Sequence, residues 1–291
     1  MSAKESAKPL SVNFHLWQPC NYHCGFCFAG FEDVKQTMLP AGHLSFEQAE
    51  SIIQQLGDYG FTKITFAGGE PTLCPWLNNL FSAAKNAGMV TMLVTNGSRL
   101  DKKTLKKYRP YLDWVVLSID SISEETNLKG GRFHNRRHLP DIHYYRNLID
   151  NIHDFQFKFK VNTVVHRYNK DEIMSDFIEA MLPLRWKLFK VLHIGNQNQE
   201  SYRNFEISDS EFSSYVINNT SLLTGKIIVV ENNDAMLESY LMIDPAGRFF
   251  DNSTGNYAYG DPICKVGIEK ALQKINFNYD KYAFRGAVYE W

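Results

Sequence analysis

The chain has 291 residues, a hydrophobic content of 44% and a formal net charge of −1, from 31 lysines and arginines against 32 aspartates and glutamates. This length and composition suit one large α/β domain, or one domain with an appendage, built around a sizeable core. The near-neutral charge gives no general attraction for nucleic acid or for an anionic membrane surface, so neither is an expected partner.

The first ten residues, MSAKESAKPL, contain no apolar stretch. No run of about 18 apolar residues occurs further along, as a membrane-spanning helix would need. We therefore expect a flexible leader over residues 1–10, no export signal and no membrane span. Five cysteines, an odd number, indicate free thiols in a reducing cytoplasm.

A first strand, predicted over residues 11–17, runs into three cysteines with CxxxCxxC spacing: Cys20, Cys24 and Cys27. Closely spaced cysteines with characteristic gaps ligate iron-sulfur clusters. Three thiolates hold three irons of a cubane [4Fe-4S] cluster and leave the fourth iron open to chelate a small molecule. The usual occupant of such a three-cysteine cluster is the methionine end of S-adenosylmethionine, so the spacing favours radical chemistry.

The same cysteines could also serve a zinc ion, a disulfide or the core. A zinc site with His23 or His15 as fourth ligand fits less well, because zinc ligands normally come as two separated pairs. A disulfide is disfavoured by the odd count, and free core cysteines at chance spacing are a further alternative. Cys74 and Cys264 belong to no motif and are expected to be buried free thiols.

Short β-rich runs alternate with helical segments through the first two thirds of the chain. Ser45 and Gln48 form a capping box at one helix start, Pro75 suits the first turn of the next helix, and Gly88 can end it. This alternation predicts an open partial barrel of parallel strands wrapped by helices. Further strands are predicted over residues 62–67, 89–94, 114–119, 157–164 and 185–191.

Glycines and polar residues follow the second, third and fourth predicted strands, at the end of the sheet where parallel α/β folds place their active sites. Each group alone is typical of a turn or a helix cap. Together with the segment 20–27 that carries the three cysteines, which we call the cysteine loop, they favour one shared ligand. His193 and Gly195 follow the sixth strand and are candidates to flank an adenine, with a surface histidine as the alternative. The groups after the strands are Gly68, Gly69, Glu70 and Pro71, then Thr95, Asn96, Gly97 and Ser98, then Ser118, Ile119 and Asp120.

Several strands carry polar side chains on one face, because side chains alternate between the two faces of a strand. A buried lysine or arginine without a partner costs several kcal/mol or shifts its pKa. Either this face points outward between helices, or it points inward around an anion, for which a polyphosphate is the best match. The sets are Asn13 with His15 and Trp17, Lys63 with Thr65, Lys158 with Lys160 and Asn162, and Arg185 with Lys187.

Residues 196–291 lack the regular alternation. Ser208 and Glu211 form a second capping box, and residues 244–247 form the turn of a predicted hairpin. A polar loop is expected over 251–262 and a helix near 265–274. We expect a barrel over 11–195 and a C-terminal α+β cap over 196–291 that closes the site, with Tyr240 on the hairpin strand.

Seven segments resemble, in order, the viperin family of radical S-adenosylmethionine (radical SAM) antiviral enzymes. The CxxxCxxC and Gly-Gly-Glu-Pro motifs support only the superfamily, whereas Asn13, Lys63, the Lys160 and Asn162 pair and the run 185–187 are specific to the family. The chain begins just before the first strand and therefore resembles the short prokaryotic viperins. The segments are SVNFHLWQPCNYHCGFCFAG, KITFAGGEP, VTNGS, LSIDS, FKVNTVVHRYN, PLRWKLFKVL and SYLMIDPAGRFF.

The resemblance implies a partial (β/α)6 TIM-like barrel of the radical SAM type, a [4Fe-4S] cluster on Cys20, Cys24 and Cys27, and roles for further residues. Residues near S-adenosylmethionine would be Gly68, Gly69, Glu70, Asn96, Ser98, Ser118, Asp120 and His193. Residues binding a triphosphate would be Lys63, Arg132, Lys160, Arg185 and Lys187, with Asn13 and Asn162 at the ribose. Lys63, Lys160 and Tyr240 would be catalytic, Tyr240 in a late proton or electron step.

The resemblance also implies a reaction. A 5′-deoxyadenosyl radical would abstract the 4′ hydrogen of CTP, UTP or GTP, and loss of water with one-electron reduction would give a 3′-deoxy-3′,4′-didehydro nucleotide that terminates viral RNA synthesis. A monomer served by flavodoxin or ferredoxin is expected. The alternatives are a radical enzyme acting on another polyanionic small molecule and a non-catalytic iron-sulfur sensor.

Overall fold

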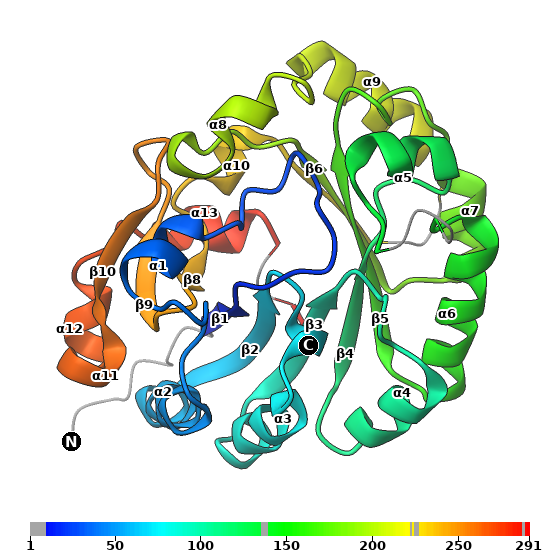
Figure 1. Ribbon diagram of the computed structural model, residues 1–291. Helices are drawn as coiled ribbons and strands as arrows, with labels where there is room; N and C mark the ends of the chain where they lie inside the picture. Colours follow the sequence, from blue (N-terminus) through cyan, green and yellow to red (C-terminus); the bar gives the residue numbers. More distant parts are fainter. Residues whose placement is uncertain (1–9, 135–138, 222, 224–226, 287–288) are drawn as a thin grey trace, which may run out of the picture.

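Figure 1 shows the computed structural model, which describes residues 10–134, 139–221, 223, 227–286 and 289–291. One sheet of ten strands curves into an open barrel, in the order β10-β9-β8-β1-β2-β3-β4-β5-β6-β7. The strands are β1 (Leu10–Trp17), β2 (Phe61–Gly68), β3 (Val90–Thr95), β4 (Trp114–Ser118), β5 (Lys158–Val165), β6 (Arg185–Lys190), β7 (Ile227–Glu231), β8 (Leu241–Ile243), β9 (Arg248–Asp251) and β10 (Ala258–Pro262).

Helices α2, α3, α4, α6 and α7 lie on the outside of the curved sheet (Figure 1). No helix in the described part of the chain is long and apolar enough to cross a membrane. The helices are α1 (Glu32–Thr37), α2 (Phe46–Tyr59), the 3-10 turn η1 (Pro71–Leu73), α3 (Leu77–Asn86), α4 (Lys102–Tyr108), α5 (Glu124–Gly130), α6 (Ile142–Asp154), α7 (Ser175–Met181), α8 (Gly195–Tyr202), α9 (Asp209–Thr220), α10 (Asn233–Met236), α11 (Ile263–Val266), α12 (Ile268–Leu272) and α13 (Tyr279–Phe284).

The predicted α/β partial barrel is confirmed. Strands β1 to β6 lie within one or two residues of the predicted ranges, and each pairs in parallel with its neighbour. Both capping boxes form, at Ser45 with Gln48 and at Ser208 with Glu211. Local patterns therefore determine this part of the fold.

The C-terminal third differs from the sequence prediction in its strands. β7 adds a seventh parallel strand beside β6, and β8 pairs in parallel with β1 on the other side of the sheet. The predicted polar loop over 251–262 is wrong at its end, since β10 pairs with β9 there. The helix predicted near 265–274 is broken into α11 and α12 at Gly267, whose φ of 79° is left-handed.

The predicted leader falls on residues 1–9, which lie outside the described residues, and Leu10 already begins β1. The division into a barrel over 11–195 and a cap over 196–291 stays a prediction. In the structure, strands from both ranges belong to the same sheet.

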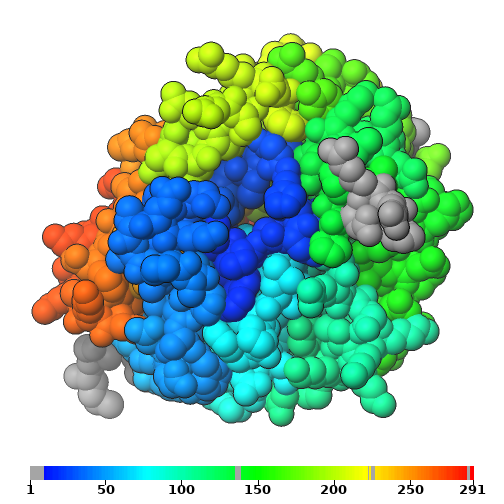
Figure 2. All heavy atoms as spheres, in the orientation of Figure 1, coloured from blue at the N-terminus to red at the C-terminus, as the bar shows by residue number. Residues whose placement is uncertain are grey.

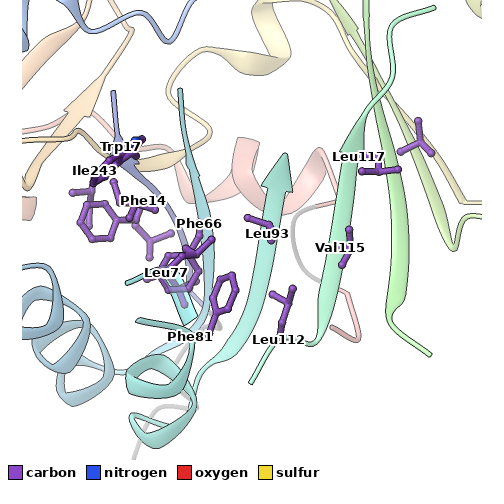
Figure 3. Packing of buried hydrophobic residues seen from close by; sticks show 14 of the residues in the cluster. Phe14, Trp17, Phe66, Leu77, Phe81, Leu93, Leu112, Val115, Leu117 and Ile243 are labelled. Atoms are coloured by element: carbon purple, nitrogen blue, oxygen red, sulfur yellow. The ribbon is translucent and has the colours of Figure 1, made fainter. Parts of the chain in front are cut away.

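The main core lies between the sheet and the outer helices (Figure 3). Phe14 of β1 pairs in register with Phe66 of β2, and the Phe66 ring meets Phe81 of α3 edge to face at 5.1 Å. Both strand residues are fully buried. Because these apolar side chains occupy the outer face of the strands, the alternate residues point to the barrel interior.

Phe66→Ala should lower the free energy of unfolding by about 3 to 5 kcal/mol, because it leaves a cavity in this core. Phe284→Ala is the matched control: its ring is 95% exposed, so the change should stay within about 0.5 kcal/mol. Urea unfolding followed by circular dichroism measures both. Equal losses in the two variants would contradict this packing.

Candidate active site

A single cavity occupies the barrel interior, bounded by the cysteine loop and by the inner faces of β1 to β6. The face in Figure 2 is hollowed near its centre, beside the dark-blue segment that carries the cysteines. Of the predicted site residues, Ser98 and His193 do not line this cavity. Those that do are Asn13, Cys20, Cys24, Cys27, Lys63, Gly68, Gly69, Glu70, Asn96, Ser118, Asp120, Arg132, Lys160, Asn162, Arg185, Lys187 and Tyr240.

The polar strand face points inward at most of its positions. His15 and Thr65 also line the cavity, but Trp17 and Lys158 do not. A register shift between His15 and Trp17 turns the Trp17 ring onto His43, at 3.9 Å between ring centroids. Lys158 is exposed, with its amine 5.3 Å from the centre of the Trp114 ring.

Backbone hydrogen bonds from the cysteine loop to the carbonyls at the end of α5 hold the loop in place. The His23 amide donates to the Gly131 carbonyl (3.1 Å) and the Gly25 amide to the Gly130 carbonyl (3.2 Å). Gly131 has φ of 73°, and a Cβ there would lie 2.1 Å from the His23 oxygen. Only glycine allows this approach.

Asn21 fixes the same loop from the β3 side. Its side-chain amide donates to Ser98 Oγ at 2.8 Å, and its oxygen accepts from Asn96 Nδ2 at 2.9 Å. The Ser98 amide in turn donates to Asn96 Oδ1 at 2.9 Å. Ser98, predicted at S-adenosylmethionine, thus reaches the site through Asn21.

Glu70 is buried, and its carboxylate joins the ends of β2 and β3. It accepts from the Thr72 amide (3.0 Å), Thr95 Oγ1 (2.7 Å) and the Asn96 amide (2.9 Å). These protein donors take most of the acceptor capacity of the carboxylate. A Cβ at Gly69 would lie 2.2 Å from the Gln18 carbonyl oxygen, so this glycine brings β2 against the chain that leads into the cysteine loop.

The three cysteine thiols are free, with Cys20 and Cys27 exposed and Cys24 half-buried. Desolvation by the surrounding protein raises the pKa of Cys20 to about 11 and that of Cys27 to about 12. Hydrogen bonds to Cys20 Sγ from the Tyr22 amide and to Cys27 Sγ from the Ala29 amide, both at 3.4 Å, partly oppose this shift. Across the described residues, no three His, Cys, Asp or Glu side chains are arranged around one metal ion. A zinc ion needs its ligands on a single atom, whereas a cubane takes one thiolate at each of three separate irons.

Arg132, predicted among the triphosphate ligands, lines the cavity and contacts the cysteine loop. Its guanidinium donates to Cys24 Sγ at 3.7 Å and to the Ser118 carbonyl, and it pairs with Asp120 at 3.0 Å. Arg132 and Asp120 are both buried. Because the Asp120 carboxylate neutralises it, Arg132 adds little net charge for a second anion.

Away from the cysteine loop, five cations line the cavity, and we call them the basic wall: Lys63, Lys160, Arg185, Lys187 and Arg285. Strand register places Lys160 beside Arg185 and Asn162 beside Lys187. Lys63 is 6% exposed and Arg185 is 5% exposed. In the described part of the chain, Asn162 Oδ1 and Arg185 Nε are buried without a hydrogen-bonding partner.

Crowding of these charges alters their pKa values. Burial, followed by the neighbouring Lys187, Lys63 and Arg185, holds the pKa of Lys160 well below its usual range. The pKa of Lys63 is lowered likewise, by burial and then by Arg285, Lys187 and Arg185. Burial lowers the pKa of Lys187 to about 8, although Glu231 opposes the shift. The wall is therefore suited to bind a polyanion that would restore its protons.

Four residues at this site were not predicted from the sequence. Arg285 belongs to the basic wall and Glu231 pairs with it. The C-terminal rings of Tyr289 and Trp291 lie 4.7 and 4.1 Å from the Lys63 amine. Tyr289 also stacks on Arg185, at 3.8 Å from the guanidinium carbon to the ring centre. The aromatic residues of the tail AVYEW are visible in the sequence. Their contacts with residues far away in the sequence could not be predicted from it.

Tyr240 faces the basic wall. Lys187 Nζ donates to its phenol oxygen at 2.6 Å, and the phenol donates to Glu231 Oε2 at 2.5 Å. Burial raises the pKa of Tyr240 well above its usual range, so the phenol is neutral.

His193, by contrast, is exposed and its ring packs on Tyr202 at 4.9 Å, which places it outside the cavity.

Known proteins resemble this chain in fold and, in other cases, in sequence as well. SuiB of Streptococcus suis, solved with S-adenosylmethionine, has a TM-score of 0.66 at 16% identity, covering 96% of this chain and 68% of that one. The enzyme anSMEcpe with bound AdoMet gives 0.68 at 15% identity, covering 95% and 82%. At these identities the likeness shows the fold alone.

Sequence relatives are closer. Residues 17–181 match the Radical SAM superfamily. A protein of Flammeovirga pacifica named S-adenosylmethionine-dependent nucleotide dehydratase is 49% identical over 97% of this chain and 96% of its own length. One of Lacinutrix mariniflava with the same name is 47% identical over 98% of this chain and 59% of its own length, and RSAD2 of Danio rerio is 34% identical over 97% and 78%. The chain therefore belongs to the radical SAM superfamily and, within it, to the viperin-like S-adenosylmethionine-dependent nucleotide dehydratases.

Proposed function

We propose that this protein dehydrates a ribonucleoside triphosphate to its 3′-deoxy-3′,4′-didehydro analogue by radical chemistry, and that the product acts as a chain terminator in antiviral defence. One observation carries the proposal: one cavity has three free cysteines in one wall and five cations in another, three of them buried and two half-buried. A nucleoside triphosphate is a ligand whose two ends match these two walls. The names of the sequence relatives support nucleotide dehydration.

The proposed cofactors are a [4Fe-4S] cluster and S-adenosylmethionine. Cys20, Cys24 and Cys27 would hold the cluster, which supplies the electron that cleaves S-adenosylmethionine. Gly68, Gly69 and the Asn96 amide group surround the adjoining part of the cavity. Ser98 supports this part through Asn21, and Asp120 through Arg132.

The proposed nucleotide lies with its triphosphate on the basic wall and its ribose between the wall and the cysteine loop. Asn13 of β1 and Asn162 of β5 line the cavity at intermediate positions of their strands. Their amides suit ribose hydroxyls, since each offers both a donor and an acceptor. Arg132, paired with Asp120, is assigned to the cysteine loop in this proposal.

The direct test is anaerobic reconstitution with iron and sulfide, followed by mass spectrometry of products from ATP, CTP, GTP and UTP. We expect at least one triphosphate to lose water and to form 5′-deoxyadenosine alongside. Cys24→Ala should form neither product, and Cys74→Ala, a buried cysteine away from the loop, should behave as the wild type. Cleavage of S-adenosylmethionine with no dehydrated nucleotide would contradict the proposal, and no cleavage at all would favour an iron-sulfur sensor.

Lys160→Ala should weaken triphosphate binding by about ten- to a hundredfold, because a charge-assisted contact in a buried site contributes about 1.5 to 3 kcal/mol. Calorimetry without reductant measures this, and the absorbance of the cluster should not change. Lys158→Ala is the matched control, two residues earlier on β5 and exposed. Unchanged affinity in Lys160→Ala would exclude the basic wall as the triphosphate site.

Nucleotide binding should take up protons. In the free protein the pKa values of Lys63 and Lys160 are lowered, and that of Lys187 lies at about 8. A bound polyanion favours the charged forms, so affinity should be greatest below these lowered pKa values and fall as the pH rises through about 8. Calorimetry in two buffers of different ionisation enthalpy measures the uptake. Binding without proton uptake near pH 8 is the opposing result.

A further inference from the structure

Glu231 is the one carboxylate in contact with the basic wall among the described residues, and the proposed reaction gives it no role. We propose that Glu231 is a positioning residue for the nucleotide reaction: it holds the Tyr240 phenol, Lys187 and Arg285 in the arrangement that the nucleotide meets. This inference rests on the proposed function.

Glu231 ends β7 and has no exposed surface. Its Oε2 accepts from the Tyr240 phenol at 2.5 Å, and its Oε1 pairs with Lys187 Nζ and lies 3.5 Å from Arg285 Nη1. All three partners line the cavity, whereas Glu231 is not among the described lining residues. The carboxylate therefore acts through the three side chains in front of it.

The contacts leave the Tyr240 phenol one orientation. Its only proton is given to Glu231, and its oxygen accepts from Lys187 at 2.6 Å. The Arg285 guanidinium carbon lies 3.6 Å from the centre of the Tyr240 ring. Arg285 is itself fixed, since its Nε donates to the Ser239 carbonyl at 2.8 Å. Glu231 thus sets both the direction of the phenol and the spacing of two cations.

Charge balance gives the second reason. Lys187 and Arg285 repel each other, and burial makes that repulsion costly. Glu231 lies against both and offsets it, so the two cations can stay together before any nucleotide arrives. Without the carboxylate, the pair would separate or Lys187 would lose its proton.

Glu231→Gln is a sharp test because each carboxylate oxygen of Glu231 accepts a hydrogen bond or pairs with a cation. The –NH2 of the amide must face one of those donors, so the group cannot satisfy all three partners. We expect kcat for nucleotide dehydration to fall about tenfold or more. In a Tyr240→Phe background the same substitution should cost less than in the wild type, because one of the three contacts of Glu231 is already lost. Independent, multiplicative losses of kcat in the double variant would overturn the proposal.

Asp244→Asn is the matched control. Asp244 is also fully buried and pairs with an arginine, Arg248 at 2.6 Å, but it does not line the cavity. Its kcat should stay within about twofold of the wild type when both variants are folded by thermal melting. A loss in Asp244→Asn equal to that in Glu231→Gln would mean that Glu231 acts only through stability, and would overturn the proposal.

A crystal structure of nucleotide-free Glu231→Gln gives a readout that does not depend on turnover. We expect the Tyr240 phenol or the Lys187 amine to leave the position seen here. If both side chains and Arg285 stay in place, Glu231 does not position them. If Glu231→Gln does not fold, Glu231→Asp keeps the charge but withdraws the acceptor by one methylene, and the same displacement is expected. A wild type that dehydrates no nucleotide would instead disprove the proposed function.

Discussion

Burial of positive charge inside the barrel is the constraint on which the rest of this structure depends. The interior of a closed parallel barrel is normally packed with branched apolar side chains. Here Lys63, Lys160, Arg185 and Lys187 occupy interior positions of β2, β5 and β6 instead. Such a cavity is stable only with partial compensation, which Glu231 and the rings of Tyr289 and Trp291 provide. What they leave uncompensated is available to an anion.

The other end of the cavity is organised by backbone contacts. The cysteine loop follows β1 and is hydrogen-bonded to Gly130 and Gly131 at the end of α5, while Asn21 ties it to β3. Gly131 also precedes Arg132, so the same turn that holds the loop carries the guanidinium to Cys24. These contacts fix the cysteine loop to the sheet and to the end of α5.

Sequence patterns were sufficient where the information is local. The two capping boxes and the period-two alternation in β1, β2, β5 and β6 predicted two helix starts and the polar strand face, and the CxxxCxxC spacing singled out three cysteines that line the same cavity. The alternation of polar and apolar residues could not show that this face points inward, because a strand has two faces and only packing selects between them. In β1 a register shift further removed Trp17 from the set.

The sequence was insufficient where the contact joins distant segments. Arg285 follows Arg185 by 100 residues, and the two meet in one wall only because α13 packs beside the barrel. β7 is a half-exposed edge strand, so its β-branched run at 227–230 has no clear alternation. The pairing of Arg132 with Asp120 could not be read from the sequence either, because the two residues belong to different segments that meet only in the folded chain.

The central claim is that one cavity joins radical generation to a bound triphosphate nucleotide. It is tested most directly with a ribonucleoside triphosphate carrying deuterium at the 4′ carbon, incubated with reconstituted protein, S-adenosylmethionine and reductant. Mass spectrometry of 5′-deoxyadenosine should show one deuterium transferred from the nucleotide. 5′-Deoxyadenosine without deuterium, formed while the nucleotide is dehydrated, would contradict this account.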